Sequence, residues 1–273
     1  MPQHESVKSA ALLVGAAIVL LLSACSNSTA IRRDGSRGAY RQVAREVQID
    51  PAAKARGTAY TMVQVSQMRL VSGDAAGAAS AAESALKAYP QSPEAHSLLA
   101  LSLDALGRGK QSGAHHRRAA ELAPDRGAFL NNYGIWLCSN GQASASLDWF
   151  DRAAAAPGYD TPGAAHANAA SCARQSGDAA RAAVSARRAL DIDRANPVAL
   201  ATLARLAFDA GRGLEARAFV ERRLAAGPAD ADTLLLASQI EKSLGDTAAA
   251  ERYVQRLRTE FPPNSRPTGT NDD

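Results

Sequence analysis

Six glycines recur along the chain at nearly constant intervals, and this regularity limits the possible folds more than any other feature of the sequence. Successive glycines are 34, 34, 36, 34 and 34 residues apart. A small residue follows each glycine by five positions and another precedes it by seven, as two closely crossing helices require. A glycine in a left-handed cap would end the first helix of each pair. The six are Gly73, Gly107, Gly141, Gly177, Gly211 and Gly245.

Proline spacing and composition favour an array of helix pairs. Pro90, Pro124, Pro228 and Pro262 each follow one of the glycines by 17 residues, where a second helix would end. Aromatic residues make up only 5% of the chain, whereas strands favour aromatic and β-branched residues. We therefore expect an all-α fold. The alternative, an ordinary helical bundle, has no reason to keep such constant spacing.

The period and the small-residue positions resemble the tetratricopeptide repeat, whose length is about 34 residues. The resemblance implies a right-handed solenoid of six helix pairs over residues 59–264, with a concave surface lined by the first helices. Most consensus aromatics are replaced here, and Thr161 and Pro162 interrupt the array. The expected repeats are 59–92, 93–126, 127–160, 163–196, 197–230 and 231–264.

The N-terminus has the pattern of a targeting segment. Residues 9–24 carry no charge and follow Lys8. As a helix this run would reach about 24 Å, short of the roughly 30 Å hydrocarbon core of a bilayer, which predicts a signal peptide over residues 1–24. Its end, Leu22-Ser23-Ala24-Cys25, resembles the bacterial lipobox, in which the cysteine is acylated and becomes the new N-terminus. The alternatives are a plain secretory signal or a membrane span with an incidental thiol.

The residue after the lipobox cysteine implies a location. Ser26 stands where an aspartate would, by the usual bacterial sorting rule, retain a lipoprotein at the inner membrane. The resemblance therefore implies lipidation at Cys25 and anchoring at the periplasmic face of the outer membrane.

The net charge of +4 comes entirely from residues 31–58. Residues 59–273 hold 23 basic and 23 acidic side chains. A nucleic-acid binder would spread its basic face over the folded body, so we expect no nucleic-acid partner. We expect residues 25–58 to be a basic linker with one short helix around Tyr40 to Val47, and residues 265–273 to be a polar tail. In the linker, Arg32, Arg33, Arg37 and Arg41 would lie against anionic lipid headgroups.

Residues capable of catalysis or metal binding do not form a recognisable motif. No two of His96, His115, His116 and His166 stand at i, i+4, so no helix-borne metal site is encoded locally. We interpret His96, His116 and His166 as substitutes for packing aromatics of the repeat. Gly107-Arg108-Gly109-Lys110 lacks phosphate-loop spacing, and Asp191 with Asp193 is interpreted as a solvated pair. We expect no enzyme, no metal and no cofactor.

A string in the third repeat suggests a more specific family. Asn131-Asn132-Tyr133-Gly134 resembles a signature of the type IV pilus biogenesis and stability lipoproteins, the PilW/PilF family. The string from His166 to Cys172 resembles that family's next repeat, and the extra residues up to Pro162 fall where the family has a longer turn. The resemblance implies a pilotin, a lipoprotein that binds the pilus secretin and promotes its outer-membrane localisation or multimerisation.

Other functions stay open at this point. A tetratricopeptide scaffold lipoprotein for another envelope assembly complex would share the anchor and the solenoid. A regulatory or peptidoglycan-processing accessory would be expected to show a catalytic dyad, and none is visible. A separate alternative for Asn131 and Asn132 is that they only satisfy backbone hydrogen-bonding groups inside the array.

Two of the three cysteines are expected to pair. Cys138 and Cys172 would lie near the same level of the first helices of the third and fourth repeats, and the periplasm is oxidising. We predict a disulfide between them, the alternative being two small buried thiols.

The start of the array is the expected partner site. The helix beginning near Ala59 has no preceding repeat to cover it, yet it carries many apolar residues. We expect Tyr60, Val63 and Gln67 to contact the secretin, with the segment Asn131, Asn132 and Tyr133 as second candidate. The alternative is that the short helix around Tyr40, Val43 and Val47 folds back over this face.

Overall fold

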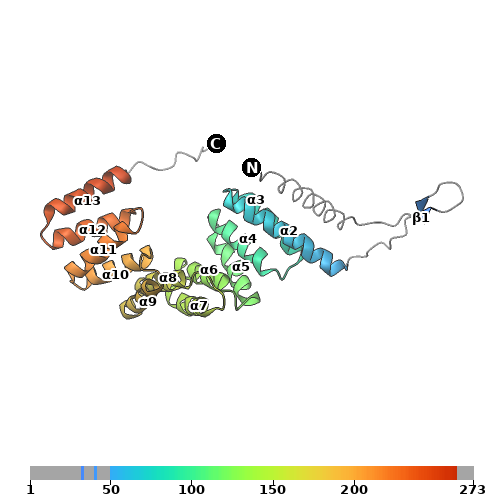
Figure 1. Ribbon diagram of the computed structural model, residues 1–273, viewed down its shortest axis with the longest axis horizontal. Coiled ribbons are helices and arrows are strands. Elements are labelled where there is room, and N and C mark those ends of the chain that lie inside the picture. Colours follow the sequence, from blue (N-terminus) through green and yellow to red (C-terminus); the bar gives the residue numbers. More distant parts are fainter. Residues whose placement is uncertain (1–31, 34–39, 42–49, 263–273) are drawn as a thin grey trace, which may run out of the picture. The chain divides into compact units, whose positions relative to one another are not determined.

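The structure is a computed structural model that describes residues 32–33, 40–41 and 50–262 (Figure 1). The chain divides into two compact units, Met1–Pro51 and Ala52–Asp273. In the first unit, strands β1 (Arg32–Arg33) and β2 (Tyr40–Arg41) pair antiparallel, with Arg32 opposite Arg41. The expectation of a helix around Tyr40 is therefore wrong at its start, because Tyr40 and Arg41 are extended and paired. Tyrosine favours strands. The rest of that expected helix lies outside the described residues, as do the predicted signal peptide with Cys25 and the polar tail.

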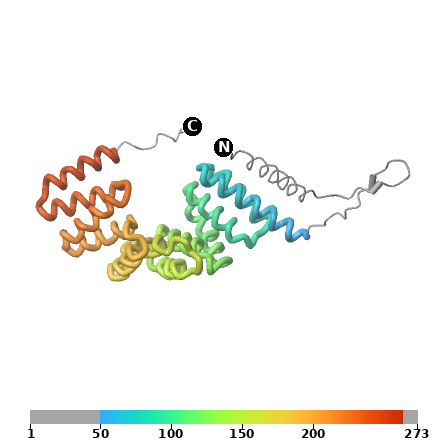
Figure 2. The backbone as a smooth tube through the Cα atoms, in the orientation of Figure 1, coloured from blue at the N-terminus to red at the C-terminus, as the bar shows by residue number. Residues whose placement is uncertain are grey.

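From Pro51 onward the described chain forms twelve helices in six pairs, which confirms the predicted all-α solenoid (Figures 1 and 2). Each pair comprises a first and a second helix joined by a short turn. The first helices are α2 (Pro51–Val71), α4 (Pro93–Ala105), α6 (Gly127–Ser139), α8 (Pro162–Gln175), α10 (Pro197–Asp209) and α12 (Ala231–Ser243). The second helices are α3 (Ala75–Ala88), α5 (Gly109–Leu122), α7 (Ala143–Ala155), α9 (Ala179–Ile192), α11 (Gly213–Ala225) and α13 (Thr247–Glu260).

The turn inside each pair is encoded by glycine. The six repeat glycines have φ between 70° and 85°, the left-handed region that costs glycine least. In three repeats an aspartate follows at once and begins the second helix: Asp74, for example, accepts a hydrogen bond from the Gly77 amide. Such N-caps typically stabilise a helix by about 1 kcal/mol. In these repeats the glycine ends the first helix and the aspartate caps the start of the second. The local sequence therefore sets where both helices of the pair meet the turn.

Small residues form the contact between helices, as their spacing predicts. Ala100, Ala170 and Ala204 are fully buried at the crossing points of first helices, and Ala78, Ala182 and Ala216 are fully buried at those of second helices. In the first repeat, the Ser66 hydroxyl donates to the Ala78 carbonyl at 2.8 Å, so the buried polar atom is satisfied across the pair. Alanine and serine therefore make up much of the buried core, together with larger residues such as Phe150 and Leu130.

Two boundaries differ from the expected ones. Helix α2 begins at Pro51, eight residues before the expected start at 59, so the linker is correspondingly shorter. Proline suits the first position of a helix, and the alanines, lysine and arginine that follow are good helix formers. The interrupting residues also belong to a helix end, because Thr161 is the N-cap residue of α8 and Pro162 its first residue.

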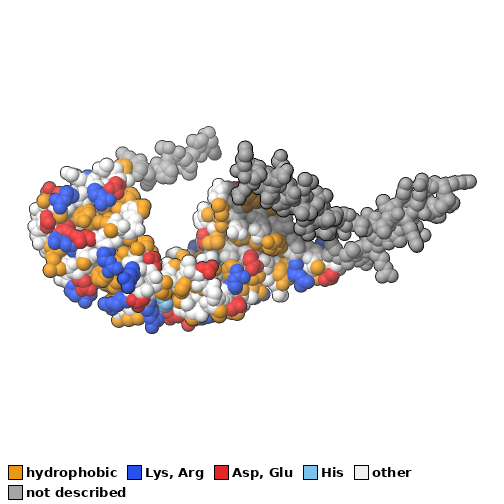
Figure 3. Space-filling view, in the orientation of Figure 1, with side chains coloured by type: hydrophobic (Ala, Val, Ile, Leu, Met, Phe, Trp, Pro, Cys, Tyr) orange, Lys and Arg blue, Asp and Glu red, His pale blue; other side chains and the backbone are white. Residues whose placement is uncertain are grey.

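Charges of both signs are interspersed over the face of the repeat unit that Figure 3 shows. Within the described ranges, no helix is both long and apolar enough to cross a bilayer.

Candidate protein-interaction surfaces

A groove of about 370 Å³ opens at the first repeat, between α2 and the start of α4. Tyr60 is 68% exposed although it is large and aromatic. We call this the first-repeat groove, and it is lined by Arg56, Ala59, Tyr60, Val63, Gln64, Tyr89, Ser92 and Glu94. Two tyrosines with a basic and an acidic residue make it an amphipathic surface suited to a protein segment.

The three residues expected at this site have different environments. Tyr60 lines the groove and is open to solvent. Val63 also lines it but is only 7% exposed, because it packs with Ala85 and Ala95 in the core. Gln67 is exposed but is not among the lining residues, and Gln64 takes the place expected for it. A single helical turn separates the two glutamines, and the i+4 spacing from Tyr60 would have favoured Gln64.

The second candidate segment does not form one patch. Asn131 is buried, and its Oδ1 accepts a hydrogen bond of 3.0 Å from Nδ2 of Asn168 on the next first helix. Tyr133 packs edge-on against Trp149, with ring centroids 4.7 Å apart. Only Asn132 lines a groove. Asn131 therefore links the third and fourth repeats, and Tyr133 packs within the third repeat. Asn132 and Tyr133 are both half-buried, and of the two only Asn132 lines this groove.

The groove beside Asn132 has a volume of about 360 Å³ and lies between α4 and α6. At its base, buried His116 bonds through Nε2 to Asp104 at 2.7 Å, and the Ser112 hydroxyl donates to the other oxygen of the same carboxylate. A serine nucleophile donates its hydroxyl hydrogen bond to the histidine imidazole. Here the Ser112 hydroxyl and the His116 ring each bond to the Asp104 carboxylate instead. This cluster therefore fixes α4 against α5. His116 occupies a packing position, as its place in the repeat predicts.

The remaining histidines are half-buried. Nδ1 of His96 lies 3.0 Å from Nδ1 of His115, and Nε2 of His96 lies 3.1 Å from the Pro90 carbonyl. Burial is the main cause that lowers the pKa of both imidazoles, and the mutual repulsion of the charged forms adds to it for His96. Burial also lowers the pKa of His166. No group of three metal-ligating side chains occurs in the described part of the chain.

Cys138 of α6 and Cys172 of α8 are joined by a disulfide in the structure, with Cα atoms 5.9 Å apart. Both cysteines are buried and pack with Phe150 and Ala169. The bridge therefore crosslinks the first helices of the third and fourth repeats, alongside the bond between Asn131 and Asn168.

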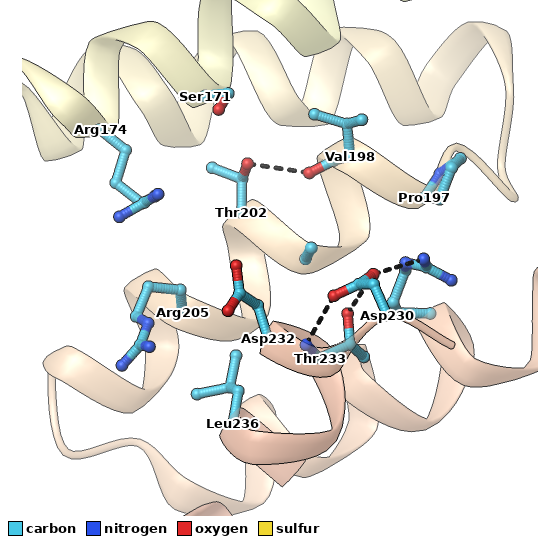
Figure 4. A pocket seen from close by; sticks show the side chains of 12 residues that line it. Ser171, Arg174, Pro197, Val198, Thr202, Arg205, Asp230, Asp232, Thr233 and Leu236 are labelled. Carbon is cyan, nitrogen blue, oxygen red and sulfur yellow. Dashed lines mark hydrogen bonds and ion pairs between the residues drawn. The ribbon is translucent and has the colours of Figure 1, made fainter. Parts of the chain in front are cut away.

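A further groove of about 440 Å³ crosses the first helices of the last three repeats, and we call it the C-terminal groove (Figure 4). Asp230 on its wall caps α12 through the Thr233 amide and pairs with Arg223 at 2.7 Å. The hydrogen bonds from Thr233 and the Arg223 cation outweigh desolvation and lower the pKa of Asp230. The groove is lined by Ser171, Arg174, Pro197, Val198, Ala201, Thr202, Arg205, Arg223, Asp230, Asp232, Thr233 and Leu236. No sequence motif predicts this surface.

Comparison with known proteins identifies the repeats. The sequence profile of the tetratricopeptide repeat family matches residues 173–240. The crystal structure of PilW, a widely conserved type IV pilus biogenesis factor, superposes with a TM-score of 0.69 at 29% identity, covering 76% of this chain and 95% of that one. The chain is therefore a tetratricopeptide repeat protein that is similar to PilW. No curated protein sequence matches the chain.

Other tetratricopeptide structures show the same fold. The PilF protein of Pseudomonas aeruginosa superposes with a TM-score of 0.68 at 22% identity, over 78% of this chain and 95% of that one. A chain of the APC/C hetero-tetramer Cut9–Hcn1 reaches a TM-score of 0.66 at 15% identity, over 76% of this chain and 41% of that one. The tetratricopeptide array is a scaffold for protein interaction, and the side chains on its grooves must decide the partner.

Proposed function

We propose that this protein is an outer-membrane lipoprotein that acts in type IV pilus biogenesis as a pilotin, binding the pilus secretin and promoting its localisation or multimerisation. The observation that carries the proposal is the match to PilW, which extends over 95% of the PilW chain and all along the helical array. A match to a few repeats would support only the fold, whereas this one spans nearly the whole of a pilus biogenesis factor.

The N-terminal sequence supports an anchored protein. The lipobox-like string ending at Cys25 precedes a basic stretch that contains Arg32 and Arg33. One acyl chain gives only marginal membrane binding, so diacylation together with basic residues near the surface supplies the two signals that stable anchoring needs. On this proposal the protein faces the periplasm, where a secretin would be assembled.

The first-repeat groove is the surface we assign to the secretin. Tyr60 and Tyr89 offer aromatic contact area, and Arg56 and Glu94 at the same groove offer one charge of each sign for orientation. Aromatic residues are enriched in protein interfaces because they bury a large area at small entropic cost. The protein would act by holding its partner, without a reaction or a cofactor.

A co-purification experiment tests the function. Outer membranes of the native bacterium are solubilised in detergent, the protein is captured through a C-terminal tag, and bound proteins are identified by mass spectrometry. Recovery of the pilus secretin, together with loss of secretin multimers in a strain that lacks this protein, is the expected result. Recovery of a different envelope assembly complex, with normal secretin multimers in the deletion strain, would assign the protein to the alternative scaffold role.

A further inference from the structure

The C-terminal groove holds two arginines that the fold does not use. The guanidinium of Arg174 of α8 makes no hydrogen bond or ion pair within the described residues, and the residue is exposed. Arg205 of α10 lies 3.7 Å from Asp209, one turn away, and its guanidinium carbon lies 6.0 Å from the centroid of the Phe208 ring. An exposed i,i+4 pair of this kind contributes only about 0.3–0.5 kcal/mol, so Arg205 is free to turn towards a ligand.

The acidic residues that line the groove offset only part of the charge of its arginines. Arg223 and Asp230 neutralise each other at 2.7 Å, and the same carboxylate accepts the Thr233 amide. Asp232 is the other lining carboxylate, and Asp209, which is not a lining residue, pairs with Arg205, so the lining itself carries three arginines and two aspartates. Figure 4 shows Arg174 and Arg205 on one side of the groove, opposite the Asp230 network. The lining thus has one more positive than negative side chain, and the guanidinium without an ion-pair partner is that of Arg174.

Apolar atoms form the floor between the two sides. Val198 is 40% exposed although it is an aliphatic residue on a packed helix, and it lies beside Ala201. The hydroxyl of Thr202 donates to the Val198 carbonyl, so it presents a methyl group and an oxygen acceptor to the groove. The hydroxyl of Ser171 has no partner among the described residues. An occupant can therefore place one apolar side chain on the floor and polar groups along the wall.

The dimensions favour an extended peptide. The groove crosses α8, α10 and α12, and helix axes in contact lie about 8–10 Å apart. Its occupant must therefore extend over about 20 Å, which corresponds to roughly six residues at about 3.3 Å per residue in a strand. An extended chain alternates its side chains, so one residue can meet the floor while the next meets the arginines.

We propose that the C-terminal groove binds an extended, acidic peptide segment of a partner protein, with one carboxylate held by Arg174 and Arg205 and a neighbouring apolar side chain on Val198 and Ala201. Guanidinium groups bind carboxylates through paired, charge-assisted hydrogen bonds, which gives this contact both strength and direction. The proposal does not depend on the identity of the partner at the first-repeat groove, which lies on other helices.

The proposal is tested with the full chain purified in detergent micelles. A displayed library of short random peptides is selected on the protein, and the enriched peptides are labelled with fluorescein and titrated by fluorescence anisotropy. We expect enrichment of Asp or Glu at one fixed position next to an apolar residue. A selection that yields no binder, or binders without an acidic preference, would overturn the proposal.

Variants assign the binding to the groove. The double variant Arg174→Gln with Arg205→Gln should bind the selected peptides about tenfold more weakly or worse, as expected for loss of charge-assisted hydrogen bonds. Arg187→Gln with Arg188→Gln removes the same charge from the exposed surface of α9 and should leave binding unchanged. Equal affinities for the two double variants would refute the site.

Two further variants test separately the apolar floor and the arginine charges of the C-terminal groove. Ala201→Phe fills the floor without changing charge, and it should abolish binding while circular dichroism reports an intact fold. Arg174→Glu with Arg205→Glu should reverse the charge preference, so that Lys replaces Asp or Glu in newly selected peptides.

Displacement of peptide by inorganic phosphate at low concentration would instead indicate an anion site. A dimer that Ala201→Phe converts to monomer would indicate a second copy as occupant, and either result would overturn the proposal.

Discussion

Phe150 of α7 fills the space that a side chain on Gly134 of α6 would occupy. A Cβ built on Gly134 would lie 2.7 Å from the Phe150 ring, closer than real Cβ contacts allow. Phe150 is fully buried. The glycine of the Asn-Asn-Tyr-Gly string is therefore explained by packing between the helices of the third repeat, independently of any partner.

Gly134→Ala should lower the free energy of unfolding. Overpacking a well-packed core costs about 1–3 kcal/mol, and this exceeds the gain of about 1 kcal/mol in helix propensity. Gly57→Ala is the matched control, since nothing lies within 4 Å of a Cβ at Gly57 on exposed α2. Chemical denaturation of both variants measures the effect. A Gly134→Ala protein as stable as Gly57→Ala would contradict the packing explanation.

The disulfide should form in the mature protein and stabilise the array. Mapping of labelled thiols in denatured, unreduced protein should find neither Cys138 nor Cys172 reactive. Replacing both by alanine should lower the free energy of unfolding by about 2–4 kcal/mol, because the bridge restricts the unfolded chain. Wild-type protein under reducing conditions should match the double variant. Two reactive thiols in freshly isolated protein would mean that the bridge is absent in the cell.

Lipidation is predicted at Cys25. Mass spectrometry of the mature N-terminus should show that residues 1–24 are missing and that an acylated cysteine begins the chain. Cys25→Ala should release the protein from outer-membrane fractions, because basic residues alone bind a surface weakly and reversibly. An unmodified Cys25, or a Cys25→Ala protein that still sediments with outer membrane, would count against the anchor.

The first-repeat groove should govern secretin multimers. Tyr60→Ser with Gln64→Ala should reduce the multimers seen on gels run without boiling, while the protein stays folded and correctly localised. Met68→Ser is the control, because Met68 is 67% exposed on the same helix and does not line the groove. Val63 is unsuitable for this test, since a polar residue there would disturb the core. Full levels of secretin multimers in the double variant would show that the first-repeat groove is not the secretin-binding site.

Stability should decrease as the pH falls below about 6.5, the ordinary pKa of histidine. Burial lowers the folded-state pKa of His96 and His115, so the unfolded chain takes up protons first and is favoured in acid. Because the Pro90 carbonyl can only accept, Nε2 of His96 carries its proton and Nδ1 accepts from His115. Protonation of His96 therefore breaks the contact between the rings.

Urea unfolding between pH 7.5 and pH 5 measures this dependence. Arg118 and His116 oppose protonation of the pair, and Glu83 favours it. His96→Gln with His115→Gln should flatten the pH profile. His166→Gln, measured in parallel, reports the part that the remaining half-buried histidine contributes. An unchanged profile in the double variant would assign the acid sensitivity to other groups.

The fold was predictable because its signals are local and repeated. The fold depends on glycines that end first helices, on aspartates or serines that cap helices, and on small residues where helices cross. Each of these acts within one or two repeats, so its spacing in the sequence is enough to identify it. The start of α2 was missed because its first turns are exposed and have no repeat signal, and only Pro51 marks their beginning. The strand at Tyr40 depends on pairing with Arg33, which residue spacing does not reveal.

The candidate surfaces were less predictable than the fold. Tyr60 is an exposed aromatic on a first helix and could be identified from its register, and the i+4 spacing from Tyr60 would also have identified Gln64 in place of Gln67. The arginines of the C-terminal groove come from different repeats, and neither stands in a motif. Their importance appears only when the pairing of Arg223 with Asp230 shows which charges are already balanced.

The bridge between Cys138 and Cys172 also changes how the array can come apart. In a stack of repeats that touch only their neighbours, fraying that begins at either end can travel along the whole molecule. A covalent link between the third and fourth repeats stops that propagation midway. If an anchored protein is pulled by an assembling partner, the residues between the two cysteines add no length to the stretched chain. The first two and the last two repeats can then open and refold separately while the third and fourth repeats stay linked.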